Sequence, residues 1–277
     1  MTDIKSMKLY THVGRVFREL GELGKTIDDP LSVDELSAFD QMHYHGTQAL
    51  DVAMAMVGTD GGQRWLEIGS GLGGPARYLA TYGDAHVTAL ELQHDQHEVA
   101  QSLTARCGLS DRVEHVCGDF LEFERAPGDF DAILSWLALY HIPDRPRLLE
   151  KCHRLLAPGG RFYTEDLSAR GDIDEAQRKL LQRDLYAITL RHINEYRRDL
   201  EDAGFDVEIC NSMSADWAEF VRVRLINFRA ERARHLRVHG EAAVNALTDF
   251  YTAVNRHFQS GKLGGLRLCA RKREDSE

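Results

Sequence analysis

Residues 64–75, Arg64-Trp-Leu-Glu-Ile-Gly-Ser-Gly-Leu-Gly-Gly-Pro75, decide the fold of this chain. Their first half is apolar enough to form a short strand that is covered on both faces. Gly69 and Gly71 then allow backbone angles, and a close ligand approach, that a β-carbon would block. Pro75 suits the first turn of a helix that its neighbours continue. The stretch therefore predicts a buried strand, a nucleotide-binding glycine turn and a helix.

The acid before the glycines distinguishes between two cofactors. The spacing Gly69-x-Gly71-x-x-Gly74 fits nicotinamide enzymes as well as enzymes that use S-adenosyl-L-methionine. Glu67 lies two residues before the first glycine, at the expected strand tip. Its carboxylate would repel a dinucleotide phosphate but attract the ammonium group of S-adenosylmethionine, directly or through water. The stretch therefore favours S-adenosylmethionine, with Glu67, Gly69, Ser70 and Gly71 as predicted cofactor-binding residues.

Composition limits the class of protein. The 277 residues suffice for one large α/β domain, which we prefer, or for two small ones. No apolar run approaches the ~18 residues of a membrane span, and the first residues lack the apolar core of a secretory signal, so we expect a soluble, cytoplasmic protein. Five scattered cysteines without a Cys-x-x-Cys pair predict neither a metal site nor a redox site. A net charge of −10 argues against nucleic acid as partner and favours a small-molecule substrate.

The N-terminal region ends in an unusual cluster of polar aromatic residues. Residues up to about 34 predict one or two short helices. Phe39-Asp-Gln-Met-His-Tyr-His-Gly46 follows, just ahead of a predicted helix over Thr47–Val57. This cluster is either a solvent-facing helix entry or a lid whose Tyr44, or a neighbouring histidine, reaches the substrate. We treat residues 1–46 as an N-terminal helical lid segment and Tyr44 as a candidate catalytic residue.

The second predicted strand, His86–Leu92, also ends in an acid. Glu91 lies 22 residues after Gly69. In this kind of sheet that position meets the ribose hydroxyls, which donate well to a carboxylate at a strand tip. The alternative is an exposed acid that opens a loop. We assign Glu91 and its neighbour Leu92 to the cofactor site.

The third predicted strand, Val113–Cys117, leads into Gly118-Asp-Phe120. Asp119 can accept a hydrogen bond from an adenine amino group, and Phe120 can pack near the adenine ring. Because the dipeptide follows the third strand in register, we assign both residues to the cofactor site.

The fourth predicted strand is Phe130–Trp136. Open α/β sheets bind ligands outside the carboxyl ends of their strands, so the residues from Ser135 to His141 should border the cofactor and the substrate. We assign Ser135 to the cofactor and Trp136 to the substrate. His141 is the first catalytic candidate, as a general base, with a purely structural histidine as the alternative.

The fifth predicted strand, Arg161–Asp166, ends in two acids, which either hold a cationic substrate or cap the next turn. Glu165 is the candidate that we assign to the substrate. The alternation of strands and helices from residue 64 to residue 166 predicts a doubly wound parallel sheet with right-handed crossovers.

Two helical insertions, at about 167–204 and 215–259, are predicted to fold back as caps over the strand tips. Tyr186 in the first insertion faces either a cleft or water, and we assign it to the substrate. The second insertion is rich in arginine, and one or two arginines at the cleft would suit an anionic group. The candidates are Arg222, Arg224, Arg229, Arg232, Arg234 and Arg237. Together with the sheet, these caps form a predicted domain over residues 47–277.

Motifs spread along the chain carry a family resemblance. They are Glu67-Ile-Gly-Ser-Gly-Leu-Gly-Gly74, Glu91, Gly118-Asp119-Phe120 and Leu156-Ala-Pro-Gly-Gly160. With these motifs the chain resembles the class I S-adenosylmethionine-dependent methyltransferases. More narrowly, it resembles the N-methyltransferases of the sarcosine/dimethylglycine and phosphoethanolamine type. The resemblance implies a Rossmann-like sheet of seven strands in which the last strand is antiparallel.

The narrower resemblance has consequences for the site. In the phosphoethanolamine enzymes a histidine after the fourth strand forms a dyad with an N-terminal tyrosine, which implies His141 and, as a possible partner, Tyr44. Both families also have Ser-x-Asp-Ala after this strand, whereas this chain has Ser135-Trp-Leu-Ala138. Either Trp136, Glu165 or another group receives a cationic substrate, for example through a π face, or the substrate is not a simple amine.

The resulting hypothesis is methyl transfer from S-adenosylmethionine to a small polar metabolite, with the nitrogen of an amino acid or related amine as the favoured acceptor. Transfer to the oxygen, sulfur or carbon of another small metabolite is the alternative within this class. A nicotinamide-dependent oxidoreductase and a non-catalytic cofactor-binding protein are the alternatives outside it. Nothing in the sequence indicates an oligomeric state.

Overall fold

The computed structural model describes residues 11–274. Its strands are β1 (Arg64–Ile68), β2 (His86–Glu91), β3 (Val113–Cys117), β4 (Phe130–Trp136), β5 (Leu156–Ala169), β6 (Arg191–His192), β7 (Phe205–Ser212) and β8 (Leu263–Lys272). Its helices are α1 (Arg15–Glu22), α2 (Val33–Ser37), α3 (Thr47–Val57), α4 (Gly74–Tyr82), α5 (His94–Arg106), α6 (Arg145–Leu155), α7 (Glu175–Leu185), α8 (Ile193–Asp202), α9 (Ser214–Ala230), α10 (Arg232–His239) and α11 (Glu241–Gln259). None of these helices is long and apolar enough to cross a membrane.

The strands form one twisted sheet in the order β3-β2-β1-β4-β5-β8-β7. Strands β1 to β5 are parallel, and β8 runs antiparallel to both of its neighbours, β5 and β7. The predicted doubly wound fold with an antiparallel last strand is therefore confirmed. The short β6, which pairs with the end of β5, is an eighth strand that the sequence pattern did not predict.

Helices cover both faces of the sheet, as expected for strands that are apolar throughout. On one face, α3 and α4 bury Leu50 and Leu79 against Trp65 of β1. On the other face, α6 and α8 bury Leu148 and Tyr196 in the second large apolar cluster. Because both faces are covered, ligands can reach the sheet at the ends of its strands.

The first predicted cap insertion, about 167–204, differs from the observed structure. β5 continues to Ala169, since its apolar residues pair with β8 along their whole length. Only α7 of this insertion joins the cap, where Leu181 and Leu185 pack with Val254 of α11. Helix α8 instead packs on the sheet. The sequence periodicity showed the helix but not which layer would bury it.

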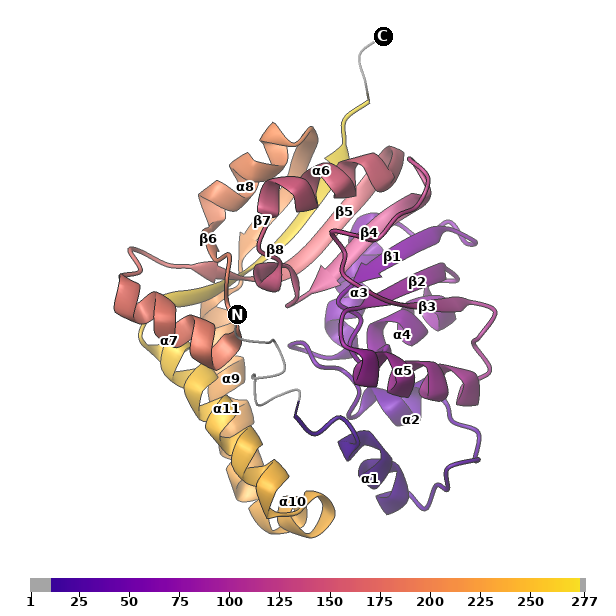
Figure 1. The fold of residues 1–277 in the computed structure, drawn as a ribbon, viewed down its shortest axis with the longest axis vertical. Coiled ribbons are helices and arrows are strands. Elements are labelled where there is room, and N and C mark those ends of the chain that lie inside the picture. The colour runs from indigo at the N-terminus through magenta and orange to yellow at the C-terminus, as the bar shows by residue number, and fades with distance from the viewer. Residues whose placement is uncertain (1–10, 275–277) are drawn as a thin grey trace.

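The second insertion forms a long helical pair. In Figure 1, α9 and α11 run side by side away from the sheet and end near α10. Trp217 of α9 lies directly on β8, at a position where a β-carbon on Gly265 would come within 1.9 Å of its ring. The absence of a side chain at Gly265 therefore allows this close approach, which fixes the root of the cap on the sheet.

Ion pairs connect the N-terminal segment to the cap. Glu19 of α1 pairs with His239 of α10 at 2.7 Å, and Glu22 pairs with Arg237 at 2.7 Å. His45, just before α3, pairs with Asp216 at 2.6 Å. The part of the predicted lid that the structure describes, residues 11–46, thus contacts the cap at two places, while residues 1–10 of that prediction lie outside the described residues.

Candidate functional site

A large cavity opens at the carboxyl ends of β1, β2 and β4, beneath the cap. It has two parts, which differ in the side chains that line them. The glycine-loop half is lined by Glu67–Leu72, Leu90–Gln93, Gln96 and Gly118–Phe120. The cap half is lined by Met42–Tyr44, Trp136–Ala138, Tyr140–Ile142, Leu167, Leu185, Arg224, Phe250, Tyr251 and Val254. Every predicted cofactor residue except Ser135 lines the first half.

Hydrogen bonds hold the glycine loop on the tips of two strands. The N–H groups of Gly69 and Ser70 both donate to the carbonyl of Leu90, at 2.9 and 3.0 Å. The carboxylate of Glu91 accepts from the N–H of Gly71 at 2.9 Å and from the N–H of Gln93 at 2.8 Å. Because each carboxylate oxygen can accept more than one hydrogen bond, Glu91 keeps acceptor capacity toward the cavity while it fixes the loop.

An alanine at position 69 should weaken the affinity for S-adenosylhomocysteine at least tenfold. Gly69 has φ = 78°, and its β-carbon would lie 2.4 Å from the β-carbon of Ala138. The left-handed angle alone costs about 1–2 kcal/mol for alanine, and relief of the overlap must displace the loop. Calorimetric titration of Gly69→Ala measures the loss. Gly108→Ala is the matched control, since Gly108 has φ = 68° but no atom within 4 Å of its β-carbon. Equal affinity in all three proteins would contradict this prediction.

The same half contains buried polar atoms that have no hydrogen-bond partner among the described residues. Glu67 is 2% exposed, and its Oε2 has no hydrogen-bond partner among the described residues. Burial raises the pKa of Glu67 well above its usual range, although the charge of Arg77 acts in the opposite direction. The hydroxyl of Ser70 and Oε1 of Gln96 likewise lack partners within residues 11–274. Buried groups of this kind are usually satisfied, so a polar ligand belongs here.

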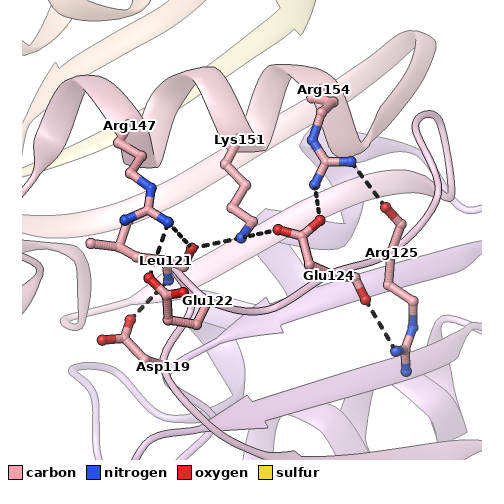
Figure 2. A network of polar contacts seen from close by, with 8 residues as sticks. All are labelled: Asp119, Leu121, Glu122, Glu124, Arg125, Arg147, Lys151 and Arg154. Atoms are coloured by element: carbon pink, nitrogen blue, oxygen red, sulfur yellow. Dashed lines mark hydrogen bonds and ion pairs between the residues drawn. The ribbon is translucent and has the colours of Figure 1, made fainter.

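Helix α6 fixes the loop that follows β3 (Figure 2). The carbonyl of Leu121 accepts from Arg147 at 2.9 Å and from Lys151 at 2.8 Å. The carboxylate of Glu124 accepts from Lys151 at 3.0 Å and from Arg154 at 2.8 Å. These three bases share one face of α6, because they are four and three residues apart. They immobilise the loop.

The loop carries two of the predicted cofactor residues. Oδ1 of Asp119 accepts from the N–H of Leu121 at 2.8 Å, and Phe120 is 3% exposed. The carboxylate of Asp119 and the ring of Phe120 both line the cavity. An acid and an aromatic ring thus stand at fixed positions beside the glycine loop, which suits an adenine ring with its amino group.

In the cap half, His141 lies in a short 3₁₀ helix, Leu139–His141, just beyond β4. Its Nδ1 lies 3.0 Å from the carbonyl oxygen of Tyr186. A carbonyl only accepts, so Nδ1 carries the proton in this contact and the basic lone pair is on Nε2. Burial lowers the pKa of His141 to about 4, although the Tyr186 carbonyl acts in the opposite direction. The ring is therefore neutral at neutral pH.

Tyr44 lines the same half of the cavity as His141. Its ring packs against Trp217 and Phe220 at centroid distances of 4.8 and 5.3 Å. The ring centroid of the preceding residue, His43, lies 5.7 Å from that of Trp136. Residues 39–44 of the polar aromatic cluster are therefore part of the cavity wall.

Lowering the pH from 7 to 5 should reduce the free energy of unfolding of the parent protein by about 2 kcal/mol more than that of a His43→Asn variant. Burial lowers the pKa of His43 to about 3, so below pH 6.5 the unfolded chain binds a proton that the folded protein excludes. Stability from this ring is present above pH 6.5 and is lost as the pH falls. Urea unfolding at both pH values measures the difference.

The comparison between variants is needed because buried carboxyls act in the opposite direction. Burial raises the pKa of Asp166 to about 7, which stabilises the folded state as the pH falls, but both proteins contain Asp166. The exposed His86→Asn is the control and should follow the parent protein. A His43→Asn variant with the same dependence on pH as the parent would refute the prediction.

Three predicted site residues do not line the cavity. The hydroxyl of Ser135 is buried and donates to the carbonyl of Ile68 at 2.9 Å. Glu165 accepts from Arg267 at 2.7 Å and from Tyr163 at 2.9 Å, so its charge is neutralised inside the sheet. Tyr186 contributes its carbonyl to His141 rather than its ring to the cavity. A position at a strand tip did not reveal which of these side chains turns toward the sheet.

Several lining residues were not singled out from the sequence. Gln96 and Tyr251 belong to predicted helices and carried no chemical signal of their own, whereas Tyr140 lies in the segment 135–141 that was predicted to border the ligands but was given no role. Arg224 was one of six cap arginines among which the helical pattern could not choose. Among residues 11–274, no three His, Cys, Asp or Glu side chains lie close enough together to hold a metal ion.

Comparison with known proteins identifies the domain. Residues 66–164 match the model of a family described as a methyltransferase domain. Methyltransferase GfsG from Streptomyces halstedii is 32% identical over 183 residues, which cover 65% of this chain and 63% of that protein. A sarcosine/dimethylglycine N-methyltransferase from Halorhodospira halochloris is 32% identical over 141 residues, 51% of this chain and 50% of that protein. The chain thus spans less than two thirds of either relative.

A solved structure extends the likeness to the whole fold. Phosphoethanolamine N-methyltransferase 2 from Haemonchus contortus, in complex with phosphomonomethylethanolamine and S-adenosylhomocysteine, superposes with a TM-score of 0.80 at 21% identity. The match covers 98% of this chain and 60% of that chain. The resemblance predicted from the glycine turn, the second-strand acid and the Gly-Asp-Phe loop is confirmed. Residues 66–164 therefore form a methyltransferase domain, and the chain has the fold of an N-methyltransferase that was solved with S-adenosylhomocysteine bound.

Proposed function

We propose that this protein transfers the methyl group of S-adenosylmethionine to a hydroxyl oxygen of a small, largely apolar acceptor, with His141 as the general base. The observation that supports a hydroxyl best is the charge of the cap half. None of the described residues that line it is an acid, whereas Arg224 lines it. A cationic amine would lose its hydration beside a guanidinium, with no carboxylate to compensate it.

The glycine-loop half fits the cofactor. We assign the ribose hydroxyls to Glu91, the adenine to Asp119 and Phe120, and the ammonium group to the region of Glu67 and Ser70. Gly69, Gly71 and Leu92 provide backbone and apolar contacts in the same half. When bound, S-adenosylmethionine supplies a methyl group on a sulfonium, which is an electrophile. The protein need only place a nucleophile against it and exclude water.

The cap half supplies the proton acceptor. The neutral His141 holds Nε2 unprotonated, because its Nδ1 proton is donated to Tyr186. A hydroxyl that donates to Nε2 loses its proton as the new carbon–oxygen bond forms and the carbon–sulfur bond breaks, and His141 leaves the step as an imidazolium. We assign Tyr44 and Trp136 to the walls that orient the acceptor, with Tyr44 as a further candidate for hydrogen bonding to it.

The amine acceptor favoured by the sequence is the second candidate. It is supported by the named activity of the Halorhodospira relative and by the π faces of Trp136 and Tyr44, which can attract a cation. It has lost one support, because Glu165 already pairs with Arg267 and lies outside the cavity.

We also propose that residues 11–46, α7 and the α9–α11 hairpin form the lid of the site. Tyr44 and Phe250, one from each side, belong to a single apolar cluster above the cavity. The contacts of Glu22 with Arg237 and of Glu19 with His239 join α1 to α10 on the outside of this lid.

A methylation assay with labelled S-adenosylmethionine tests the proposal. The panel pairs each acceptor with a close relative: phenols and hydroxy acids against the corresponding amines, amino acids and thiols. Labelled methyl ethers, identified by mass spectrometry, would support the proposal, whereas methyl esters would contradict it, because a carboxylate has no proton for His141 to accept. Products labelled only at nitrogen would establish the second candidate, and labelling at sulfur or carbon alone would refute both.

A further inference from the structure

Arg224 differs from the other arginines of the cap in its surroundings. Its guanidinium carbon lies 5.0 Å from the ring centroid of Tyr44, 5.5 Å from that of Phe220 and 4.7 Å from that of Tyr251. Its Nε is buried and has no hydrogen-bond partner among the described residues. Aromatic rings from the N-terminal segment, α9 and α11 therefore surround a cation on the cavity wall.

The neighbouring arginines have partners outside the cavity. Arg222 pairs with Glu219 at 2.6 Å, and Arg237 pairs with Glu22 at 2.7 Å. Arg229 donates to the hydroxyl of Thr252, and Arg232 donates to the side-chain oxygen of Asn245. Within residues 11–274, by contrast, no carboxylate oxygen comes within 4 Å of a side-chain nitrogen of Arg224. Among the cap arginines that pair with no acid within the described residues, Arg224 is thus the one that lines the cavity.

The acids that line the cavity cannot serve as its partner. Asp40 pairs with Arg77 at 2.9 Å. Glu91 and Asp119 accept hydrogen bonds from the backbone of their own loops. Asp40 lines the cavity from the N-terminal segment, whereas Glu91 and Asp119 line it from the strand ends, together with Glu67. Rings alone compensate a desolvated cation only in part, and guanidinium pairs best with an oxyanion in a two-point contact.

We infer that Arg224 binds an oxyanion of the acceptor, so that the substrate is an anionic molecule with an apolar or aromatic body. The oxyanion would occupy the cap end of the cavity, and Tyr44, Phe250 and Tyr251 would cover the body. This inference rests on the proposed function only in naming the ligand as the methyl acceptor. Carboxylate and phosphonate share the required chemistry, and the test separates them.

Binding of probes without a nucleophile tests the inference apart from catalysis. Phenylacetate, phenylacetamide and benzylphosphonate are titrated by calorimetry into the protein saturated with S-adenosylhomocysteine. We expect at least one of the two anions to bind about tenfold or more tightly than the amide, as for hydrogen bonds to a charged group. The tighter of the two anions identifies the class.

Variants of the arginine locate the effect. Arg224→Gln should bring the anion and the amide to within about threefold of each other, and Arg224→Lys should retain part of the preference, because lysine keeps the charge but not the two-point geometry. Arg222→Gln, two residues away on the same helix and paired with Glu219, should keep the full preference. Circular dichroism and S-adenosylhomocysteine affinity verify that each variant is folded.

Three results would overturn the inference. They are equal affinities for anion and amide in the parent protein, no binding of any probe at millimolar concentration, and a preference that survives in Arg224→Gln. A positive binding result with no methylated product in the acceptor panel would remove the proposed function and keep the anion site.

Discussion

Replacing His141 by asparagine should lower kcat by about 10²- to 10⁴-fold while the affinity for S-adenosylhomocysteine stays within about threefold of the parent value. Asparagine keeps an N–H that can donate to the carbonyl of Tyr186, the contact that Nδ1 makes in the parent protein. It has no atom that can take up a proton in place of Nε2. The variant therefore separates the base from the structural contact.

The alternative, a structural histidine, makes a different prediction for the same variant. If His141 only holds the turn after β4 against the segment at Tyr186, the His141→Asn variant should retain most of the activity and a His141→Ala variant should not. Single-turnover rates and calorimetric binding of S-adenosylhomocysteine are measured for both variants. Near-parental turnover in His141→Asn, or parallel losses of turnover and cofactor affinity, would contradict the role as base.

Replacing Asp40 by alanine should lower the free energy of unfolding by about 3–5 kcal/mol. Asp40 is 2% exposed and lies 2.9 Å from Arg77, which is fully buried. Arg77 also donates to the carbonyl of Leu72 and to the hydroxyl of Thr104. Removal of the carboxylate would leave a buried guanidinium without a compensating charge, and that is the origin of the large cost.

The Asp40 substitution should also reach the site. A β-carbon on Gly74 would come within 2.9 Å of the Asp40 side chain, so the carboxylate packs directly on the start of α4. We expect weaker cofactor binding together with the lower urea midpoint. Glu219→Ala is the control, because its pair with Arg222 is exposed and should contribute little to stability. A loss below about 1 kcal/mol in Asp40→Ala would contradict the prediction.

Taken together, Asp40 and Tyr44 show what the N-terminal segment does. Asp40 joins the segment to the helix that follows the glycine turn, and Tyr44 joins it to the cap. The segment therefore connects the glycine-loop half of the cavity with the cap half. A change in either contact should be felt in both halves.

The sequence determined the sheet and the glycine loop with the acids at its strand tips. A strand that is buried on both faces must be apolar along its length, and the glycines between Gly69 and Gly74 are required by close backbone approaches that no other residue allows. The acids at the tips of β1 and β2 follow from the same local pattern. These features depend on neighbours in the chain, so residues 64–166 were enough to predict the parallel sheet, and residues 64–120 were enough to predict the glycine loop and the acids.

The tertiary structure alone decided the cap half. Whether Glu165 faces a ligand or Arg267 depends on β8, which lies about a hundred residues later in the chain. The helical pattern likewise could not decide whether Arg222 or Arg224 faces the cavity. Only the packing of α9 on Gly265 and against α11 turns Arg224 toward the cavity and leaves Arg222 with Glu219. The orientation of a side chain at a cavity wall is set by contacts between distant segments, and no local pattern records those contacts.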